Sequence, residues 1–179
     1  DVDEKRIVPW FREHIAALRA ALGDGVDIMV DNHGRSRPPL AIRQIEAVEE
    51  YGLLFFEEPV PPENLEYLSL VRQARLRTEL AAGERAFNRW QSREMIQRQL
   101  VDVIQPDICH CGGISELRRI AALAEIYSIL VAPHNPSGPV ATVASGQVCA
   151  TMSNFFILEY AWGEADWRAD LLSPREPIE

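Results

Sequence analysis

Six short apolar segments, each ending at an acidic residue or a histidine, constrain the fold of this chain more than any other feature. The residues at these ends follow one another at steps of 23 to 27 residues: Asp31, Glu57, Glu84, Asp107, His134 and Glu159. Apolar residues at helical spacing fill the intervals, as with Ile42, Ile45 and Val48. Strands that alternate with helices through short connections predict consecutive βα units in one parallel sheet.

The pattern also predicts where each element lies. We expect strands over 25–31, 53–57, 78–84, 101–107, 128–134 and 154–160, and helices over 4–22, 38–51, 64–74, 92–100, 114–127 and 138–152. Ser92 is expected to cap the fourth helix. The run Leu53–Phe56 is apolar throughout, which indicates burial on both faces, as in a parallel sheet covered by helices. Residues 161–179 are expected to be irregular.

A β/α barrel is built from this repeat and collects the carboxyl ends of its strands around one active site. An open doubly wound sheet is the alternative, but it would not bring six successive strand ends around one point. A complete barrel has eight units and about 250 residues, whereas this chain has 179 residues and six predicted units. We therefore expect residues 1–179 to form one partial barrel domain of a longer polypeptide.

Charge and cysteine content exclude several classes of function. The formal net charge is −9 and no basic cluster is visible, so we expect no binding to nucleic acid or to an anionic membrane surface. The apolar runs are too short to span a bilayer. Cys109, Cys111 and Cys149 are an odd set without disulfide-framework spacing, which indicates a reducing compartment such as the cytoplasm. We interpret all three as small buried residues.

Three consecutive strand ends carry carboxylates that could share one metal ion. Adjacent strands lie about 4.8 Å apart, so Asp31, Glu57 and Glu84 could reach a common point. Three hard oxygen ligands favour Mg²⁺, or Mn²⁺, over zinc. Spacing alone does not separate Glu57 from Glu58, but Glu57 shares its strand face with Phe55 and is preferred.

Histidines accompany these acids. His33 follows Asp31 by two residues and is expected to project to the same face. His134 ends the strand next to Asp107, and a carboxylate beside an imidazole fixes its tautomer and suits a general base. The alternative is that packing alone holds His134 in its loop. A histidine on each side of a bound substrate suggests one base and one acid. His110, near a predicted helix start, is expected to be structural.

The chain resembles the enolase superfamily, in particular its mandelate racemase branch and the sugar-acid dehydratases of the galactonate dehydratase type. The resemblance covers nearly the whole chain and rests on motifs in family order: Val30-Asp31-Asn32-His33-Gly34-Arg35, Phe56-Glu57-Glu58-Pro59, Ala82-Gly83-Glu84-Arg85, Gln105-Pro106-Asp107 with Gly112-Gly113-Ile114, Ala132-Pro133-His134 and Leu158-Glu159-Tyr160. It implies a TIM-type barrel with about six of eight units present and the α+β capping domain absent from this chain.

The resemblance also implies a role for each strand-end residue. It implies that Asp31, Glu57 and Glu84 bind one Mg²⁺, and that His134, paired with Asp107, is the catalytic base. It also implies that His33 is the acid that protonates the departing hydroxyl and that Glu159 stabilises the enediolate. The implied substrate contacts are Arg85, His33, His134 and Glu159. The implied reaction is Mg²⁺-dependent dehydration of an aldonic acid such as galactonate to a 2-keto-3-deoxy acid, by a homo-oligomer.

Two other functions remain open from the sequence. One is a racemase or epimerase of a 2-hydroxy acid that uses the same metal site and His134. The other is a non-catalytic relative that binds a carboxylate. His33 favours dehydration because an acid for a leaving group has no use in racemisation. All the expected metal ligands and His134 are present, which favours an enzyme.

Overall fold

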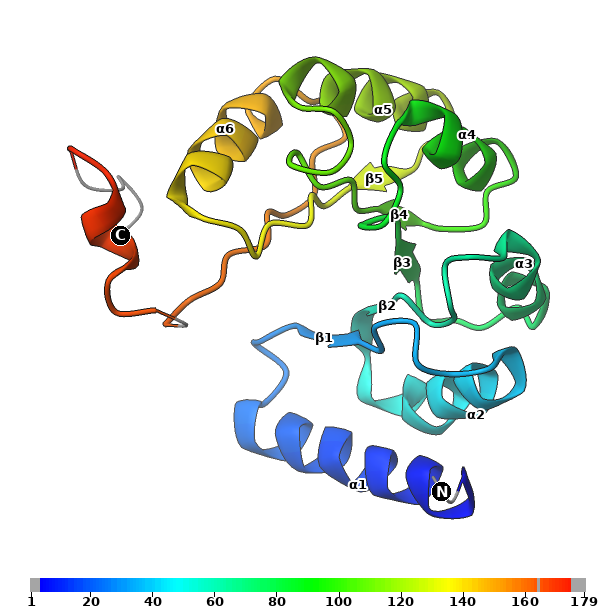
Figure 1. The fold of residues 1–179 in the computed structure, drawn as a ribbon. Helices are drawn as coiled ribbons and strands as arrows, with labels where there is room; N and C mark the ends of the chain where they lie inside the picture. The colour runs from blue at the N-terminus through cyan, green and yellow to red at the C-terminus, as the bar shows by residue number, and fades with distance from the viewer. Residues whose placement is uncertain (1–3, 164, 175–179) are drawn as a thin grey trace. The chain divides into compact units, whose positions relative to one another are not determined.

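The computed structural model describes residues 4–163 and 165–174, which form an α/β fold of alternating strands and helices (Figure 1). The chain divides into two compact units. The first unit comprises residues 1–82 and 100–103, and the second comprises 83–99 and 104–179. The expected α/β class is therefore confirmed.

The first unit contains three strands and the helices between them. Its elements are α1 (Glu4–Leu22), β1 (Ile28–Asp31), α2 (Pro38–Val48), the 3-10 helix η1 (Glu49–Tyr51), β2 (Leu53–Glu57), α3 (Leu65–Gln73) and β3 (Leu80–Ala82). β2 pairs in parallel with β1 on one side and with β3 on the other. α1 packs against α2, and α2 packs against α3 (Figure 1). Consecutive strands are thus neighbours, as the repeat predicts.

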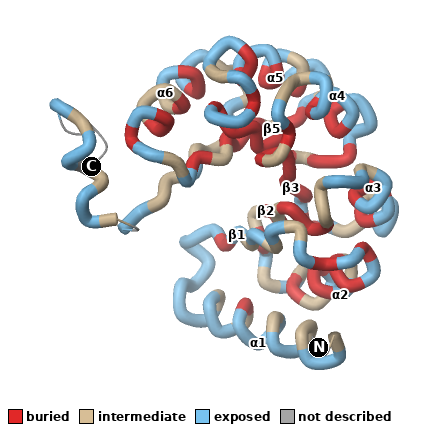
Figure 2. The backbone as a smooth tube through the Cα atoms, in the orientation of Figure 1, coloured by how far each residue is buried: buried red, intermediate tan, exposed pale blue. Residues whose placement is uncertain are grey.

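Side chains from α2, α3 and the strands make the core of this unit. Ile45, Phe56 and Val71 are fully buried, whereas most of α1 is exposed (Figure 2). Asp102 ties β3 to α3: its carboxylate accepts two hydrogen bonds of 2.8 Å from the Arg72 guanidinium and one of 2.9 Å from the Leu80 N–H. A bidentate, charged contact of this kind fixes geometry as well as adding stability.

The second unit continues the alternation. It contains α4 (Arg89–Gln97), α5 (Ile114–Ile126), β5 (Leu130–Val131), α6 (Pro139–Cys149) and the 3-10 helix η2 (Arg168–Leu171). The two-residue strand β4 (Val103–Ile104) is divided between the units, and its second residue belongs to this one. The Ala132 N–H donates to the Ile104 carbonyl across 3.1 Å and so joins the segments of β4 and β5. α5 packs against both α4 and α6 (Figure 1). Among the described residues, every helix falls short of the length and apolarity that a bilayer span demands.

Four sequence predictions were wrong in detail. Residues 161–179, expected to be irregular, contain the 3-10 helix η2. The segment 154–160 forms no strand among the described residues; it makes an isolated parallel bridge between Val131 and Phe155. Asn88, not Ser92, caps α4, because its extended backbone lets its side chain accept from two N–H groups of the first turn, each at 3.1 Å. Cys111 and Cys149 are buried as expected, but Cys109 is exposed. Part of 161–179, namely 164 and 175–179, lies outside the described residues.

Candidate active site

A hydrogen-bonded histidine and aspartate form the centre of the second unit's site. Asp107 lies three residues after β4 and His134 three residues after β5. His134 Nδ1 lies 2.7 Å from Asp107 Oδ2. A carboxylate accepts and does not donate, so the proton of this bond belongs to Nδ1, and Nε2 of neutral His134 keeps its lone pair. The pair therefore presents a base at Nε2.

The surroundings shift the pKa of both partners toward their charged forms. Burial raises the pKa of Asp107, but hydrogen bonds from His134 and from the Cys109 N–H, with nearby histidine charge, outweigh it and lower that pKa. Burial lowers the pKa of His134, but the bond to Asp107 and the charges of Glu84, Glu159 and Asp107 outweigh it and raise that pKa. His134 is therefore a stronger base than an isolated imidazole.

Two further carboxylates face the free nitrogen of His134. Nε2 lies 3.6 Å from Glu84 Oε2 and 4.0 Å from Glu159 Oε2. The Glu84 side chain is 6% exposed, and its Oε1 also accepts from Arg85 Nε at 3.3 Å. A reacting atom that approached Nε2 would therefore lie beside two carboxylates and near one guanidinium.

The residue before Glu84 explains how the acid comes so close to the neighbouring strand. Gly83 has φ +129°, and a Cβ there would lie 2.9 Å from Ile104 Cδ1. Only glycine accepts both the dihedral angle and the contact. A side chain at this position would displace the segment that carries Glu84.

A buried network holds the loop of His134. The Asn135 N–H donates to Glu159 Oε2 across 2.7 Å, and the Asn135 amide donates to Thr142 Oγ1 across 2.9 Å. Arg168 then donates to Thr142 Oγ1 and to the Ser137 carbonyl, each across 2.6 Å. Sequence reasoning missed Arg168, and no sequence pattern marks it, because the contact depends on how the polypeptide returns from 161 to 168.

His110 lies beside the pair. Its Nδ1 is 3.8 Å from Asp107 Oδ2 and 3.3 Å from the Glu84 carbonyl, and its ring centre is 6.1 Å from that of His134. Phe87 contacts the other side of the ring, with centroids 6.0 Å apart. The structure thus brings together four predicted site residues, Glu84, Asp107, His134 and Glu159, and adds His110 to them.

The first unit carries three more predicted residues, namely Asp31, His33 and Glu57. Asp31 is the last residue of β1, and His33 follows in a turn with φ +53°. The two side chains meet as expected, but through the turn and not through a strand pleat: the His33 N–H donates to Asp31 Oδ1 at 2.6 Å, and His33 Nδ1 lies 3.0 Å from Asp31 Oδ2. Both side chains are 47% exposed.

Asp31 and Glu57 are partners in the parallel register of β1 and β2, so both acids lie at the carboxyl end of neighbouring strands. Backbone bonds connect the two loops beyond these ends: the Asn32 N–H donates to the Glu57 carbonyl across 3.0 Å, and the Gly34 N–H donates to the Glu58 carbonyl across 2.7 Å. Glu58 is only 2% exposed, whereas Glu57 is half-buried and thus more accessible to an ion.

The chemistry of the acids fits a hard divalent cation. Asp31 and Glu57 offer carboxylate oxygens from paired strand ends, and Glu84 offers a buried carboxylate in the second unit. Oxygen-only donor sets suit Mg²⁺ or Mn²⁺. Of the three, only Glu84 is buried; Asp31 is exposed and Glu57 is half-buried.

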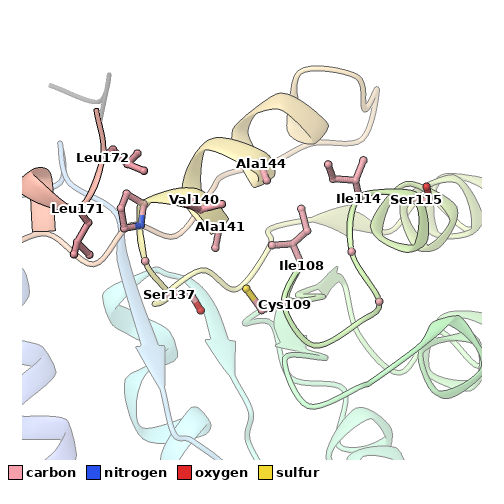
Figure 3. Close-up of a pocket in the computed structure, with 14 residues that line it drawn as sticks. Ile108, Cys109, Ile114, Ser115, Ser137, Val140, Ala141, Ala144, Leu171 and Leu172 are labelled. Carbon is pink, nitrogen blue, oxygen red and sulfur yellow. The ribbon is translucent and has the colours of Figure 1, made fainter. Parts of the chain in front are cut away.

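A separate apolar cavity of about 720 Å³ lies in the second unit. Figure 3 shows Ile108 and Cys109 on one wall, Val140 and Ala141 on another, and Leu171 and Leu172 at the edge. Its lining includes neither Asp107 nor His134. Its apolar walls also do not suit a polyhydroxylated acid, so we do not assign the substrate to it.

Comparison with known proteins identifies the family of this chain. The Enolase C-terminal domain-like family matches residues 8–179. The chain belongs to this family. It is 38% identical over 167 residues to the D-xylonate dehydratase of Haloferax volcanii, covering 93% of the chain and 40% of that protein. It is also 38% identical over 163 residues to the D-galactonate dehydratase of Ralstonia nicotianae, covering 90% of the chain and 42% of that protein.

Solved structures place the chain in the same family. An enolase from Agrobacterium radiobacter, crystallised with bound Na and L-malate, superposes with a TM-score of 0.85 at 41% identity, covering 89% of this chain and 40% of that one. The family resemblance and the enolase barrel-type fold inferred from the sequence are thereby confirmed. The chain spans about 40% of the length of the curated relatives it matches.

Proposed function

We propose that the full-length protein is a Mg²⁺-dependent dehydratase of aldonic acids. The observation that carries the proposal is the His134–Asp107 hydrogen bond of 2.7 Å, with His134 Nε2 facing Glu84 and Glu159. Support also comes from the relatives, which are dehydratases of D-xylonate and D-galactonate, and from the neighbouring structure that holds L-malate, a small 2-hydroxy acid.

Asp31, Glu57 and Glu84 would hold the Mg²⁺, as three hard oxygen ligands. When bound there, the ion would neutralise charge that develops on the substrate carboxylate as its α-proton leaves. A protonated Glu159 would donate a hydrogen bond to the same carboxylate, and Arg85 beside Glu84 would bind a substrate oxygen. These contacts would lower the free energy of the enediolate relative to the bound acid.

The chain's histidines would move the protons. His134 Nε2 takes the proton from the carbon α to the carboxylate, and Asp107 stabilises the imidazolium that results. His33 donates a proton to the hydroxyl on the β carbon, which leaves as water with the electrons of the C–O bond. The enol that remains tautomerises to the 2-keto-3-deoxy acid. One proton leaves the α carbon, and one water molecule is released per turnover.

A screen of the full-length protein against a panel of aldonic acids in the presence of Mg²⁺ tests the proposal. We expect a 2-keto product from at least one five- or six-carbon aldonate, and we expect a chelator to abolish it. Exchange of the α proton with solvent without any 2-keto product would instead identify a racemase or epimerase. Absence of both reactions across the panel would identify a carboxylate-binding protein. Homo-oligomerisation and a cytoplasmic location stay predictions from the sequence.

A further inference from the structure

A second cluster of metal-ligating atoms lies within the second unit and differs in kind from the three carboxylates. Asp107, His110 and His134 each offer one ligand atom, and these atoms all lie within 4.8 Å of one another. Two imidazoles and one carboxylate are the donors of many zinc sites, whereas Mg²⁺ prefers oxygen alone. The cluster therefore selects a different class of cation.

The distances suit a tetrahedral ion. Asp107 Oδ2 lies 2.7 Å from His134 Nδ1 and 3.8 Å from His110 Nδ1. Zinc bonds of about 2.0–2.1 Å in tetrahedral geometry set ligand atoms roughly 3.4 Å apart, between these two separations. The two histidine ligand atoms also lie within 4.8 Å of each other.

The surroundings support the three ligands and leave them accessible. The Cys109 N–H donates to Asp107 Oδ1 across 2.6 Å and so directs Oδ2 toward the histidines. The His110 side chain is 44% exposed, which opens the cluster to ions from solvent. A hydrogen-bonded carboxylate beside metal-binding imidazoles is a recurrent way of orienting such ligands.

We propose that Asp107, His110 and His134 bind Zn²⁺ or a similar borderline divalent cation, and that this ion inhibits the enzyme. The ion takes the place of the proton on His134 Nδ1, and neutral His134 then carries its proton on Nε2. Nε2 loses its lone pair and no longer accepts a proton. The binding site stands on the geometry alone, whereas the inhibition rests on the proposed function.

Zinc binding by the full-length protein, measured against a chromogenic zinc indicator in excess Mg²⁺, tests the site without any assay of activity. We expect His110→Ala and His110→Gln to weaken the site roughly tenfold or more. His14→Ala is the matched control, because His14 is an exposed histidine on α1 whose described contacts, a hydrogen bond to the Trp10 carbonyl and a ring contact with Trp10, lie within its own helix. It should bind zinc like the unmodified protein.

Co²⁺ offers a second readout, because a tetrahedral site with nitrogen ligands absorbs visible light far more strongly than octahedral oxygen ligands do. We expect this absorption in the unmodified protein and its loss in His110→Gln. Unchanged zinc affinity in both His110 variants would overturn the site. So would a loss of affinity in Asp31→Asn instead, because zinc would then occupy the carboxylates. Zinc binding through His110 in a protein that dehydrates no aldonate would leave the site standing and reject only the proposed function.

Discussion

Replacement of Asp107 by asparagine probes the base directly while it preserves the shape of the side chain. Asp107 is 1% exposed, and its Oδ2 accepts the 2.7 Å hydrogen bond from His134 Nδ1. Hydrogen bonds to a charged group contribute about 1.5–3 kcal/mol. Since 1.36 kcal/mol corresponds to a factor of ten in rate, weakening of this bond alone lowers kcat about 10- to 100-fold.

A second effect adds to the first. An asparagine amide can donate to Nδ1, which moves the histidine proton to Nε2 and removes the lone pair that takes the substrate proton. We therefore expect kcat for aldonate dehydration to fall by about 10² to 10⁴ in Asp107→Asn. Steady-state kinetics of the full-length protein measure this, with exposed Asp27→Asn as the control. A kcat that falls by less than about threefold would refute the assignment of His134 and Asp107 as a catalytic pair, because the expected loss is far larger.

Three further predictions concern other parts of the chain. Burial raises the pKa of Glu49, but hydrogen bonds from Arg77 and Thr78 outweigh it and lower that pKa. The Glu49 carboxylate therefore stabilises the folded protein above the pKa that Glu49 has in the unfolded protein. This stabilisation is lost as the pH falls through the lower pKa that Glu49 has in the folded protein. Glu49→Gln should lower Tm at pH 7, and the difference from the unmodified protein should shrink below the ordinary value of 4.5, with exposed Glu46→Gln as the control. Burial raises the pKa of Cys111 and of Cys149 to about 11, so iodoacetamide should label exposed Cys109 in the native protein and leave both of the others unlabelled by peptide mass spectrometry. Arg168→Met removes the hydrogen bonds to Ser137 and Thr142 and so loosens the His134 loop, which should lower kcat by about 10-fold. The control variant Arg118→Met, at an exposed arginine, should leave kcat unchanged.

The fold class could be predicted because the repeat is long, regular and reinforced at every unit. Each apolar strand ends at an ionisable residue, and each helix shows its own periodicity, so errors in single elements do not change the topology. Strand lengths were less predictable: β4 and β5 have two residues each, since irregular loops begin well before Asp107 and His134. Segment 154–160 satisfies strand composition, yet hydrogen bonds to β5 through only an isolated bridge in the described region.

Residue types at strand ends predicted the contact of His134 with Asp107 and that of His33 with Asp31. The details of their geometry were not encoded locally. His33 reaches Asp31 because it adopts a left-handed turn, which the sequence Asp31-Asn32-His33-Gly34 does not specify. Cys109 is exposed and lines the apolar cavity, which no pattern in the sequence indicates. Arg168 contacts the His134 loop from about thirty residues away, and contacts of that range depend on tertiary structure alone.

The proton exchange of the two histidine variants tests the central claim most directly. The full-length protein is incubated in D₂O with Mg²⁺ and the aldonate that it converts, and the α proton and the 2-keto product are followed by NMR. We expect His134→Asn to lose both exchange and dehydration, and His33→Asn to lose dehydration but retain exchange. Dehydration at the normal rate by His33→Asn, or continued exchange by His134→Asn, would contradict the assignment of acid and base.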